Sequence, residues 1–366
     1  MEPPAGGGGA HQGLLYGSPE ELLGAAVPFL RQGLAAGNAV VLACGNAGNA
    51  LLAEALPGRE RGDVVLVDRA QVYTRPAGAV AALRRFVRAD LQPHARGVRL
   101  VGEVDFGADP ASRREWMGFE AIMNVVLASV RLRCVCAYDT RVLPEPVLDA
   151  AARTHPEFLA PAGAVPSPGY TDPAAFVAGL PPARPDPLER TPPVYQPDPV
   201  TESGQIPALR TRLRSVLDGL AMPAPTRSNL LAAVSETLAN GMLHGTLPVR
   251  LCLWADPSRL VCTVTDQGSG FDDRMLGYGP PGGDLHGGAG LWLARRCCDR
   301  VETFHGPDGF TVRLVLALPA RPRPAEMEGT RARVENMQHR ANAAAIRADR
   351  LGRKAGHLSR RAGRLA

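Results

Sequence analysis

The sequence is nearly devoid of lysine. Lys354 is the single lysine among 366 residues, and it lies in a basic C-terminal stretch away from every glycine-rich loop. A Walker A loop needs a lysine beside the β- and γ-phosphates, and a protein kinase of the usual eukaryotic type needs one on a strand. The composition therefore excludes ordinary P-loop nucleotide binding and that kinase fold. Any nucleotide site in this chain must hold its phosphates by other means.

Long apolar runs are also missing. No run approaches the roughly 20 residues that a membrane-spanning helix requires. The opening stretch MEPPAGGGGA has neither the charged region nor the apolar region of a signal peptide. We therefore expect a cytoplasmic protein with no membrane partner.

The chain has seven cysteines, an odd number that does not favour a disulfide framework. In a chain of this length they are better explained as reduced core thiols. We expect Cys134 and Cys136, two residues apart in an apolar run, to face opposite sides of a strand, and no second cysteine pair completes a zinc site. Cys297 and Cys298 are expected to be packing residues.

Basic charge is concentrated at one end of the chain. From Ala320 onward there are twelve basic and four acidic residues, whereas the whole chain has a net charge of +5. Such a tail could bind nucleic acid or an acidic partner, but a solvated extension is commoner, and its apolar residues form no heptad. We do not expect nucleic acid as a partner, and the basic tail, residues 320–366, is left without a role.

The length of the chain and its changes of pattern indicate two domains. A flexible lead, residues 1–10, is followed by residues 11–160, in which helical and strand patterns alternate; this order favours a mainly parallel α/β sheet covered on both faces. Expected strands are 39–44, 64–68, 98–105 and 133–139, and expected helices are 18–37, 79–91 and 114–130. Residues 161–205 are rich in proline and are expected to be a linker with little regular structure.

Residues 206–319 have a different order of elements. Two amphipathic helices, at 209–220 and 226–245, precede an antiparallel hairpin of strands 249–254 and 260–266. A Gly/Pro-rich loop, a helix at 291–299 and strands at 300–304 and 310–318 follow. The order is helix, hairpin, glycine loop, helix, hairpin.

The helix at 226–245 carries three polar residues at four-residue spacing, Glu236, Asn240 and His244. This spacing stacks side chains on one face, opposite an apolar stripe of Leu231, Val234, Leu238 and Met242. A solvated polar face is the usual explanation of such residues. The alternative is a carboxylate and an amide that line a site.

Three motifs together resemble the N, G1 and G2 boxes of the GHKL ATPases, the superfamily of gyrase, MutL, histidine kinases and anti-sigma factor serine kinases. Glu236 with Asn240 corresponds to the N box. The stretch DQGSG, residues 266–270, matches Asp-x-Gly-x-Gly, and GGAGLWLA, residues 287–294, matches Gly-x-Gly-Leu. The resemblance covers about residues 206–319 and implies the GHKL (Bergerat) α/β sandwich with an antiparallel or mixed sheet, and ATP and Mg²⁺ as cofactors.

The resemblance implies a role for each polar residue of these motifs. Asn240 offers its amide oxygen to Mg²⁺, a hard cation that prefers oxygen ligands. Glu236 is placed as the general base that takes a proton from the attacking hydroxyl or water. Asp266 accepts a hydrogen bond from the adenine amino group.

The glycines and one threonine complete the implied ATP site. Gly268 and Gly270 let the backbone approach the base without a Cβ atom. Gly288 and Gly290 do the same beside the phosphates, where a helix aims its first N–H groups at negative charge. Thr311 is implied to reach adenine through water.

Two nearby features have competing explanations. The stretch GYGPPG, residues 277–282, matches G-x-G-x-x-G, but its prolines remove N–H donors and no strand precedes it, so a mobile lid is the better interpretation. His244 could cover a phosphate or could cap its helix before Gly245. Both interpretations of His244 stay open.

Within the superfamily, the motifs look most like the anti-sigma regulatory factor serine/threonine kinases. A histidine kinase needs a phosphoacceptor histidine on a helical hairpin, yet no histidine lies between His155 and His244. The resemblance implies an ATP-dependent kinase that binds a sigma factor and phosphorylates a serine of a STAS-type anti-sigma antagonist, and it allows a homodimer. The alternatives are an ATP-gated partner-binding switch and a histidine kinase-like ATPase without that phosphotransfer.

The N-terminal domain resembles the MEDS sensory domain, which is related to RecA-type folds. The resemblance is carried by HQGLLYGSPEELLGAAVPFLRQGLAAGNAVVLAC, VRLVGEVDFG, EWMGFEAIMNVV, CAYDTRVLP and RTHPEFL. Polar and aromatic residues recur in these segments: His11, Glu103, Trp116, Glu120, Tyr138, Asp139 and His155. They could line a pocket for a small-molecule ligand or form a satisfied structural network, and the sequence leaves both open.

Overall fold

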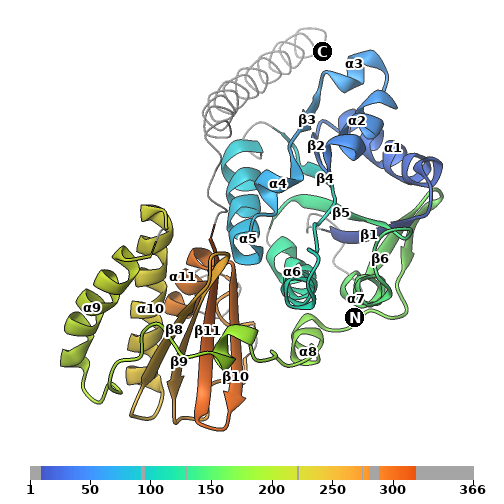
Figure 1. Ribbon diagram of the computed structural model, residues 1–366. Coiled ribbons are helices and arrows are strands. Elements are labelled where there is room, and N and C mark those ends of the chain that lie inside the picture. The colour runs from blue at the N-terminus through green and yellow to red at the C-terminus, as the bar shows by residue number, and fades with distance from the viewer. Residues whose placement is uncertain are drawn as a thin grey trace, which may run out of the picture.

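The computed structural model describes residues 10–91, 95–128, 130–220, 222–273, 275–279 and 288–318. Two α/β domains lie side by side (Figure 1). Most of the expected N-terminal lead, loop residues 280–287 and the basic tail lie outside the described residues. None of the helices in the described ranges combines the length and apolar character that crossing a membrane requires.

The N-terminal domain is built on a seven-stranded sheet with the order β3-β2-β4-β5-β1-β6-β7. Its strands pair in parallel except β7, which runs antiparallel to β6. The prediction of a mainly parallel α/β sheet is therefore confirmed. The strands are β1 (Ala10–Tyr16), β2 (Ala39–Ala43), β3 (Val64–Leu66), β4 (Val98–Gly102), β5 (Leu132–Asp139), β6 (Glu157–Ala160) and β7 (Gly163–Pro166).

Helices cover both faces of this sheet, and the two faces form separate cores. Val41 of β2 packs into one core and Leu42 into the other, because successive strand residues point to opposite faces. Helices α1 (Pro19–Ala35) and α2 (Asn46–Glu54) belong to one core. The opposite core includes α5 (Pro76–Arg85), α6 (Pro110–Ala128), α7 (Glu145–Thr154) and α8 (Pro173–Ala178). The short helices α3 (Gly58–Arg61) and α4 (Arg69–Val72) flank β3, and a π-helical turn (Phe86–Leu91) follows α5.

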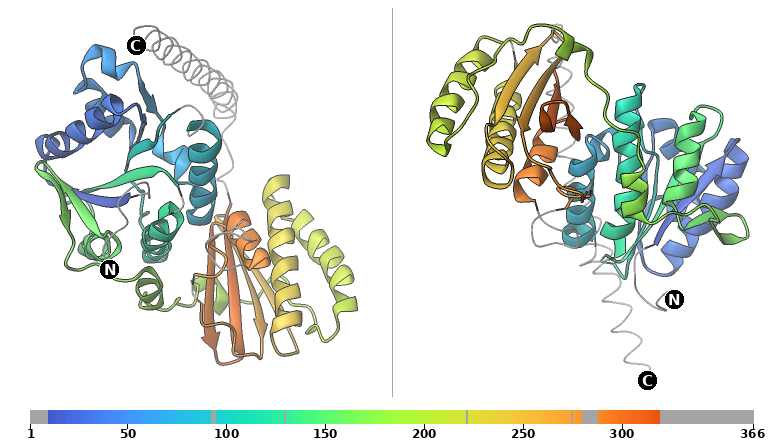
Figure 2. Two further views of the ribbon diagram at one scale, coloured as in Figure 1. Left: turned by 180° about the vertical axis from the view of Figure 1, so that it is seen from behind. Right: turned by 90° about the horizontal axis from the view of Figure 1, so that it is seen from below.

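The C-terminal domain is a sandwich of helices on a four-stranded antiparallel sheet, with the order β10-β11-β9-β8. The view from behind shows the helices beside the sheet (Figure 2). The elements are α9 (Ile206–Asp218), α10 (Ala224–His244), β8 (Arg250–Ala255), β9 (Arg259–Asp266), α11 (Ala289–Cys297), β10 (Arg300–Gly306) and β11 (Gly309–Ala317). Apolar residues of all three helices share one core with the sheet, as the GHKL resemblance implies.

The segment between the domains has more structure than expected. It contains β7, α8 and two 3₁₀ turns, Pro187–Arg190 and Ser203–Gln205. Val200 forms a β-bridge with Val249, and Tyr195 forms one with Leu253 of β8. Because β8 is an edge strand, these bridges cover backbone groups that would otherwise be open to another chain. Proline density therefore marks a segment that packs along the sheet.

The two domains touch through charged residues and through helices. Helix α11 of the second domain packs against α5 of the first. Nε of Arg75, which precedes α5, lies 2.5 Å from Oδ1 of Asp299, and Arg300 pairs with Asp109 at 3.8 Å. The C-terminal domain is thus attached to the N-terminal domain close to α11.

Candidate nucleotide-binding site

The N-box residues lie where the G2 helix begins. Glu236 and Asn240 are half-buried on α10, and Gly290 is buried in the first turn of α11. A Cβ atom on Gly290 would lie 2.8 Å from Nδ2 of Asn240 and 3.0 Å from Oε2 of Glu236. Only glycine permits this approach without displacement of the two side chains. The structure therefore brings Glu236, Asn240 and Gly290 together.

Asp266 ends β9 and is held in one orientation by backbone donors. Its side chain is buried, and its Oδ1 atom accepts hydrogen bonds from the N–H groups of Gly268 at 2.7 Å and Thr246 at 3.2 Å. A Cβ atom on Gly268 would lie 2.7 Å from the same Oδ1 atom. The sharp turn after β9 thus depends on glycine and fixes the carboxylate.

Position 270 requires glycine for two reasons, the backbone conformation and the lack of space for a side chain. Its φ angle is +65°, in the left-handed region that side chains disfavour. The ring of Phe310, on β11, occupies the space that a Cβ atom would take, and Phe271 packs against the same ring with 5.1 Å between centroids. The G1 turn is therefore anchored on the neighbouring strand.

The first N–H groups of α11 have no partners within that helix, as at every helix start. Gly288 occupies the N-cap position without a side-chain hydrogen bond. A helix N-terminus with exposed donors attracts anions such as phosphate. This end of α11 adjoins Asn240, so a phosphate group there would lie beside an amide oxygen that can ligate a cation.

The side chain of Thr311, which the resemblance placed near adenine, does not lie beside Asp266. Phe310 is the register partner of Asp266, and Phe310 and Val312 face the helices. Because side chains alternate along a strand, Thr311 points to the opposite face, where its hydroxyl lies 2.9 Å from that of Thr265. His244 is exposed in the last turn of α10.

The start of the loop expected to be a mobile lid is buried. Tyr278 of this loop, and Met275 just before the loop, pack into the hydrophobic core of the N-terminal domain. The guanidinium of Arg295, on α11, lies 3.9 Å from the centroid of the Tyr278 ring. The remaining loop residues, 280–287, lie outside the described ones. The described part of the loop therefore joins the nucleotide-site helix to the other domain.

Tyr278 and Arg295 both contact a buried glutamate on α6, Glu115. The hydroxyl of Tyr278 lies 3.4 Å from Oε2 of Glu115, and Nη1 of Arg295 lies 3.7 Å from the same atom. Burial raises the pKa of Glu115, although Arg295 and Arg114 act in the opposite direction. Burial also raises the pKa of Tyr278 to about 12, which keeps its hydroxyl a neutral donor. Sequence reasoning missed Glu115, Tyr278 and Arg295, since nothing in a single sequence pairs residues of two domains.

Three of the polar or aromatic residues noted in the N-terminal domain, Glu103, Trp116 and Asp139, have partners for their side chains within that domain. Glu103 accepts hydrogen bonds from the Tyr16 hydroxyl and the Gly45 N–H, both at 3.0 Å. Asp139 binds the Arg141 guanidinium through both oxygens, and Trp116 packs edge-on against Tyr73 and Phe119. The sequence left two explanations open, a ligand pocket and a structural network. The network accounts for Glu103, Trp116 and Asp139. The Glu103 carboxylate also occupies the N-terminus of α2, where a phosphate would otherwise be attracted.

The prediction for Cys134 and Cys136 was wrong. Their Sγ atoms lie 3.9 Å apart on the same face of β5, because a spacing of two residues returns a strand to the same face. Cys136 lies 3.3 Å from Nε2 of His11. Cys297 and Cys298 are buried in the core of the C-terminal domain, as expected.

Comparison with known families identifies both domains. Residues 10–156 match the family model described as the MEthanogen/methylotroph, DcmR Sensory domain (MEDS), and residues 200–316 match the histidine kinase-like ATPase domain. The chain therefore combines a MEDS sensory domain with a histidine kinase-like ATPase domain, and the two resemblances seen in the sequence are confirmed.

Whole-protein comparisons add little to these family matches. No curated protein matches the chain. Among solved structures, it is similar to the RsbU and RsbW domains of Rv1364c from Mycobacterium tuberculosis, with 18% identity and a TM-score of 0.27. That match covers 36% of this chain and 34% of the other, so it spans about a third of that chain's length.

Proposed function

We propose that this protein is an ATP-binding regulator of transcription, a serine/threonine kinase of the anti-sigma factor type whose activity the MEDS domain controls. The observation that carries the proposal is the contact of Gly290 with Asn240 and Glu236. It supports the proposal because an amide that could ligate a cation, a carboxylate and a helix N-terminus that could attract phosphate lie close together. The partners on this proposal are a sigma factor and a STAS-type antagonist, in the cytoplasm.

The residues present fit ATP with Mg²⁺. The space beside Asn240 is one that a Cβ atom at position 290 would fill, and the amide oxygen of Asn240 is a ligand of the hard type that Mg²⁺ prefers. Bound Mg²⁺ would neutralise charge on the phosphates. The first N–H groups of α11 would bind phosphate oxygens, and Asp266 would accept a hydrogen bond from the adenine amino group.

Glu236 would act on the phosphate acceptor. As the hydroxyl oxygen of the antagonist's serine forms a bond to the γ-phosphorus, the bond from that phosphorus to the bridging oxygen breaks and ADP leaves. The Glu236 carboxylate accepts the hydroxyl proton. Asn240, one turn along α10, positions the phosphates and takes no proton.

The contact between domains supports control by the MEDS domain. Arg295 lies on the same short helix as Gly290, and it reaches Glu115 of α6 and the ring of Tyr278. A change in the position of α6 would therefore act on the helix that begins at the phosphates. Sensory control is thus supported by a physical connection of buried side chains.

The test is phosphate transfer from γ-labelled ATP to the cognate antagonist, with the full chain. We expect Glu236→Gln to retain ATP affinity while transfer falls about 10²- to 10⁴-fold, since glutamine cannot take the proton. Asn240→Ala is expected to lose Mg²⁺-dependent ATP binding itself. Asn229→Ala is the matched control, because it removes an amide from the same helix about three turns away.

Each result has a defined meaning. Normal phosphorylation by Glu236→Gln would show that Glu236 is not the base. A wild-type protein that captures its partner only with ATP, yet transfers no phosphate, would be the ATP-gated switch. Equal, modest losses of stability in both variants with unchanged ATP binding would indicate a merely structural polar face and overturn the proposal.

A further inference from the structure

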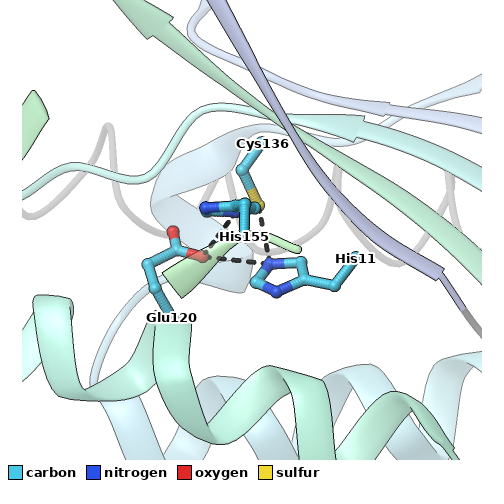
Figure 3. Close-up of side chains that lie close together, drawn as sticks. All are labelled: His11, Glu120, Cys136 and His155. Atoms are coloured by element: carbon cyan, nitrogen blue, oxygen red, sulfur yellow. Dashed lines mark hydrogen bonds and ion pairs between the residues drawn. The ribbon is translucent and has the colours of Figure 1, made fainter. Parts of the chain in front are cut away.

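Four side chains with metal-binding atoms meet inside the N-terminal domain, remote from the nucleotide site. They are His11 of β1, Glu120 of α6, Cys136 of β5 and His155, which follows α7 (Figure 3). Each is at most 3% exposed, and their ligand atoms all lie within 4.8 Å of one another. Neither family match explains why two imidazoles, a carboxylate and a thiol should share one buried space.

Hydrogen bonds fix the orientation of both imidazoles. Nδ1 of His155 lies 2.9 Å from the carbonyl oxygen of Ala151, which can only accept, so Nδ1 carries the proton. Nδ1 of His11 faces Oδ1 of Asn124 at 3.3 Å, while the amide nitrogen of Asn124 donates to backbone carbonyls, including that of Thr154 at 2.7 Å. In the neutral form, each histidine therefore presents a bare Nε2 lone pair to the centre of the cluster.

The centre of the cluster holds more acceptor atoms than strong donors. Nε2 of His155 lies 3.5 Å from Oε2 of Glu120, and Nε2 of His11 lies 3.1 Å from the same oxygen. Among the described residues, neither Nε2 of His155 nor either carboxylate oxygen of Glu120 receives a hydrogen bond. Buried acceptors without donors are costly. The Cys136 thiol and the Tyr138 hydroxyl lie near Glu120, but no described residue donates to Nε2 of His155. A cation among them would bind Nε2 of His155 and one carboxylate oxygen of Glu120.

We propose that His11, Glu120, Cys136 and His155 bind one divalent transition-metal ion, best matched by Zn²⁺, in a closed site inside the MEDS domain. Zn²⁺ takes four ligands in a tetrahedron, at about 2.0 to 2.1 Å for nitrogen, 2.0 to 2.2 Å for oxygen and 2.3 Å for sulfur. Ligand atoms at those distances lie about 3.3 to 3.7 Å from each other. Three of the six separations, 3.1, 3.3 and 3.5 Å, are close to this geometry, and the others lie within 4.8 Å, so a bound ion would draw the ligands together.

The charges and surrounding contacts are those of a structural zinc site. With Cys136 as thiolate and Glu120 as carboxylate, a divalent ion makes the buried site neutral, which removes the main obstacle to burying charge. The hydrogen bonds on Nδ1 of both histidines are the outer contacts that usually orient metal-binding imidazoles. Four protein ligands leave no open position for a substrate, so the ion would join β1, α6, β5 and the segment after α7.

The test measures metal in the full chain expressed with added Zn²⁺. We expect about one zinc per chain after gel filtration, and a loss of at least about fivefold in Cys136→Ser and His155→Gln, because three protein ligands bind zinc far less tightly than four. Cys134→Ser is the matched control: it alters a buried cysteine on the same face of β5, and it is expected to retain the metal.

The wild-type protein provides a second measurement that does not depend on how the variants fold. X-ray absorption of the zinc-loaded chain is expected to show one sulfur at about 2.3 Å and three nitrogen or oxygen ligands at about 2.0 Å. The chain expressed with Co²⁺ is expected to show a thiolate-to-cobalt absorption band. Absence of bound metal, a sulfur-free coordination sphere, or full retention of zinc by both ligand variants would overturn the proposal.

Discussion

The hydroxyl of Tyr278 lies 3.4 Å from Oε2 of Glu115, and the two residues are 163 positions apart in different domains. If this contact couples the domains, Tyr278→Phe and Glu115→Gln should not be additive in the free energy of unfolding. We expect an interaction energy of about 0.5 to 1.5 kcal/mol from a double-mutant cycle measured by urea denaturation. Tyr170→Phe, at a tyrosine that is 39% exposed, should change stability by less than about 0.5 kcal/mol. Additive effects would show that the contact does not form.

Because Gly290 lies so close to Asn240 and Glu236, adding one methyl group at position 290 should affect ATP binding. Gly290→Ala should lower ATP affinity by at least about tenfold, because its Cβ atom would displace the Asn240 amide and the Glu236 carboxylate. Calorimetry with Mg²⁺ and ATP measures the change. Gly204→Ala is the control, since a Cβ atom there meets nothing within 4 Å. Unchanged ATP affinity in Gly290→Ala would show that the contact of Gly290 with Asn240 and Glu236 is not part of the nucleotide site.

Asp266 allows a test of the adenine position. Asp266→Asn keeps an acceptor for the N–H groups of Gly268 and Thr246 but removes the charge that strengthens a bond to the adenine amino group. We expect ATP affinity to fall by about tenfold, with little change in the melting temperature. A variant with normal affinity would place adenine elsewhere.

The ion pair of Arg75 with Asp299 should matter much less than the buried contacts. Both side chains are about a third exposed, and exposed pairs contribute about 0 to 1 kcal/mol. Arg75→Gln should therefore shift the free energy of unfolding by no more than about 1 kcal/mol, and less at high salt. Denaturation at two salt concentrations checks this expectation. A larger effect that persists at high salt would show that this pair, too, holds the domains together.

The sequence predicted most of the sheet in the N-terminal domain because its strands are continuous apolar runs between turn residues. It missed β6 and β7, which are only four residues each, and it missed β1, since His11 and Gln12 are buried in the middle of the domain and hide the apolar pattern. The hairpins of the second domain were predicted from alternation and turns. Helix α10 was predicted from its period, which also brought Glu236 and Asn240 to one face.

Contacts that depend on register could not be predicted. The face of Thr311 follows from the pairing of Phe310 with Asp266, and a shift by one residue would reverse it. His11 meets Cys136 only because β1 lies next to β5 in the sheet, although 125 positions separate them. The local sequence pattern predicts neither relationship, because both depend on how strands that are distant in the sequence pair.

The burial of Met275 and Tyr278 in the core of the MEDS domain makes one stretch of chain common to two folding units. Thermodynamic reciprocity then applies to whatever the two units bind. If ATP binding pulls this stretch, which already contacts α11 through Arg295, out of the MEDS core, the core loses apolar contacts and the MEDS domain unfolds at a lower temperature when nucleotide is present. Under that condition, a ligand that binds only the intact MEDS core weakens ATP binding by the same factor by which ATP weakens the binding of that ligand. Calorimetry with ATP would then detect such a ligand before its chemical identity is known.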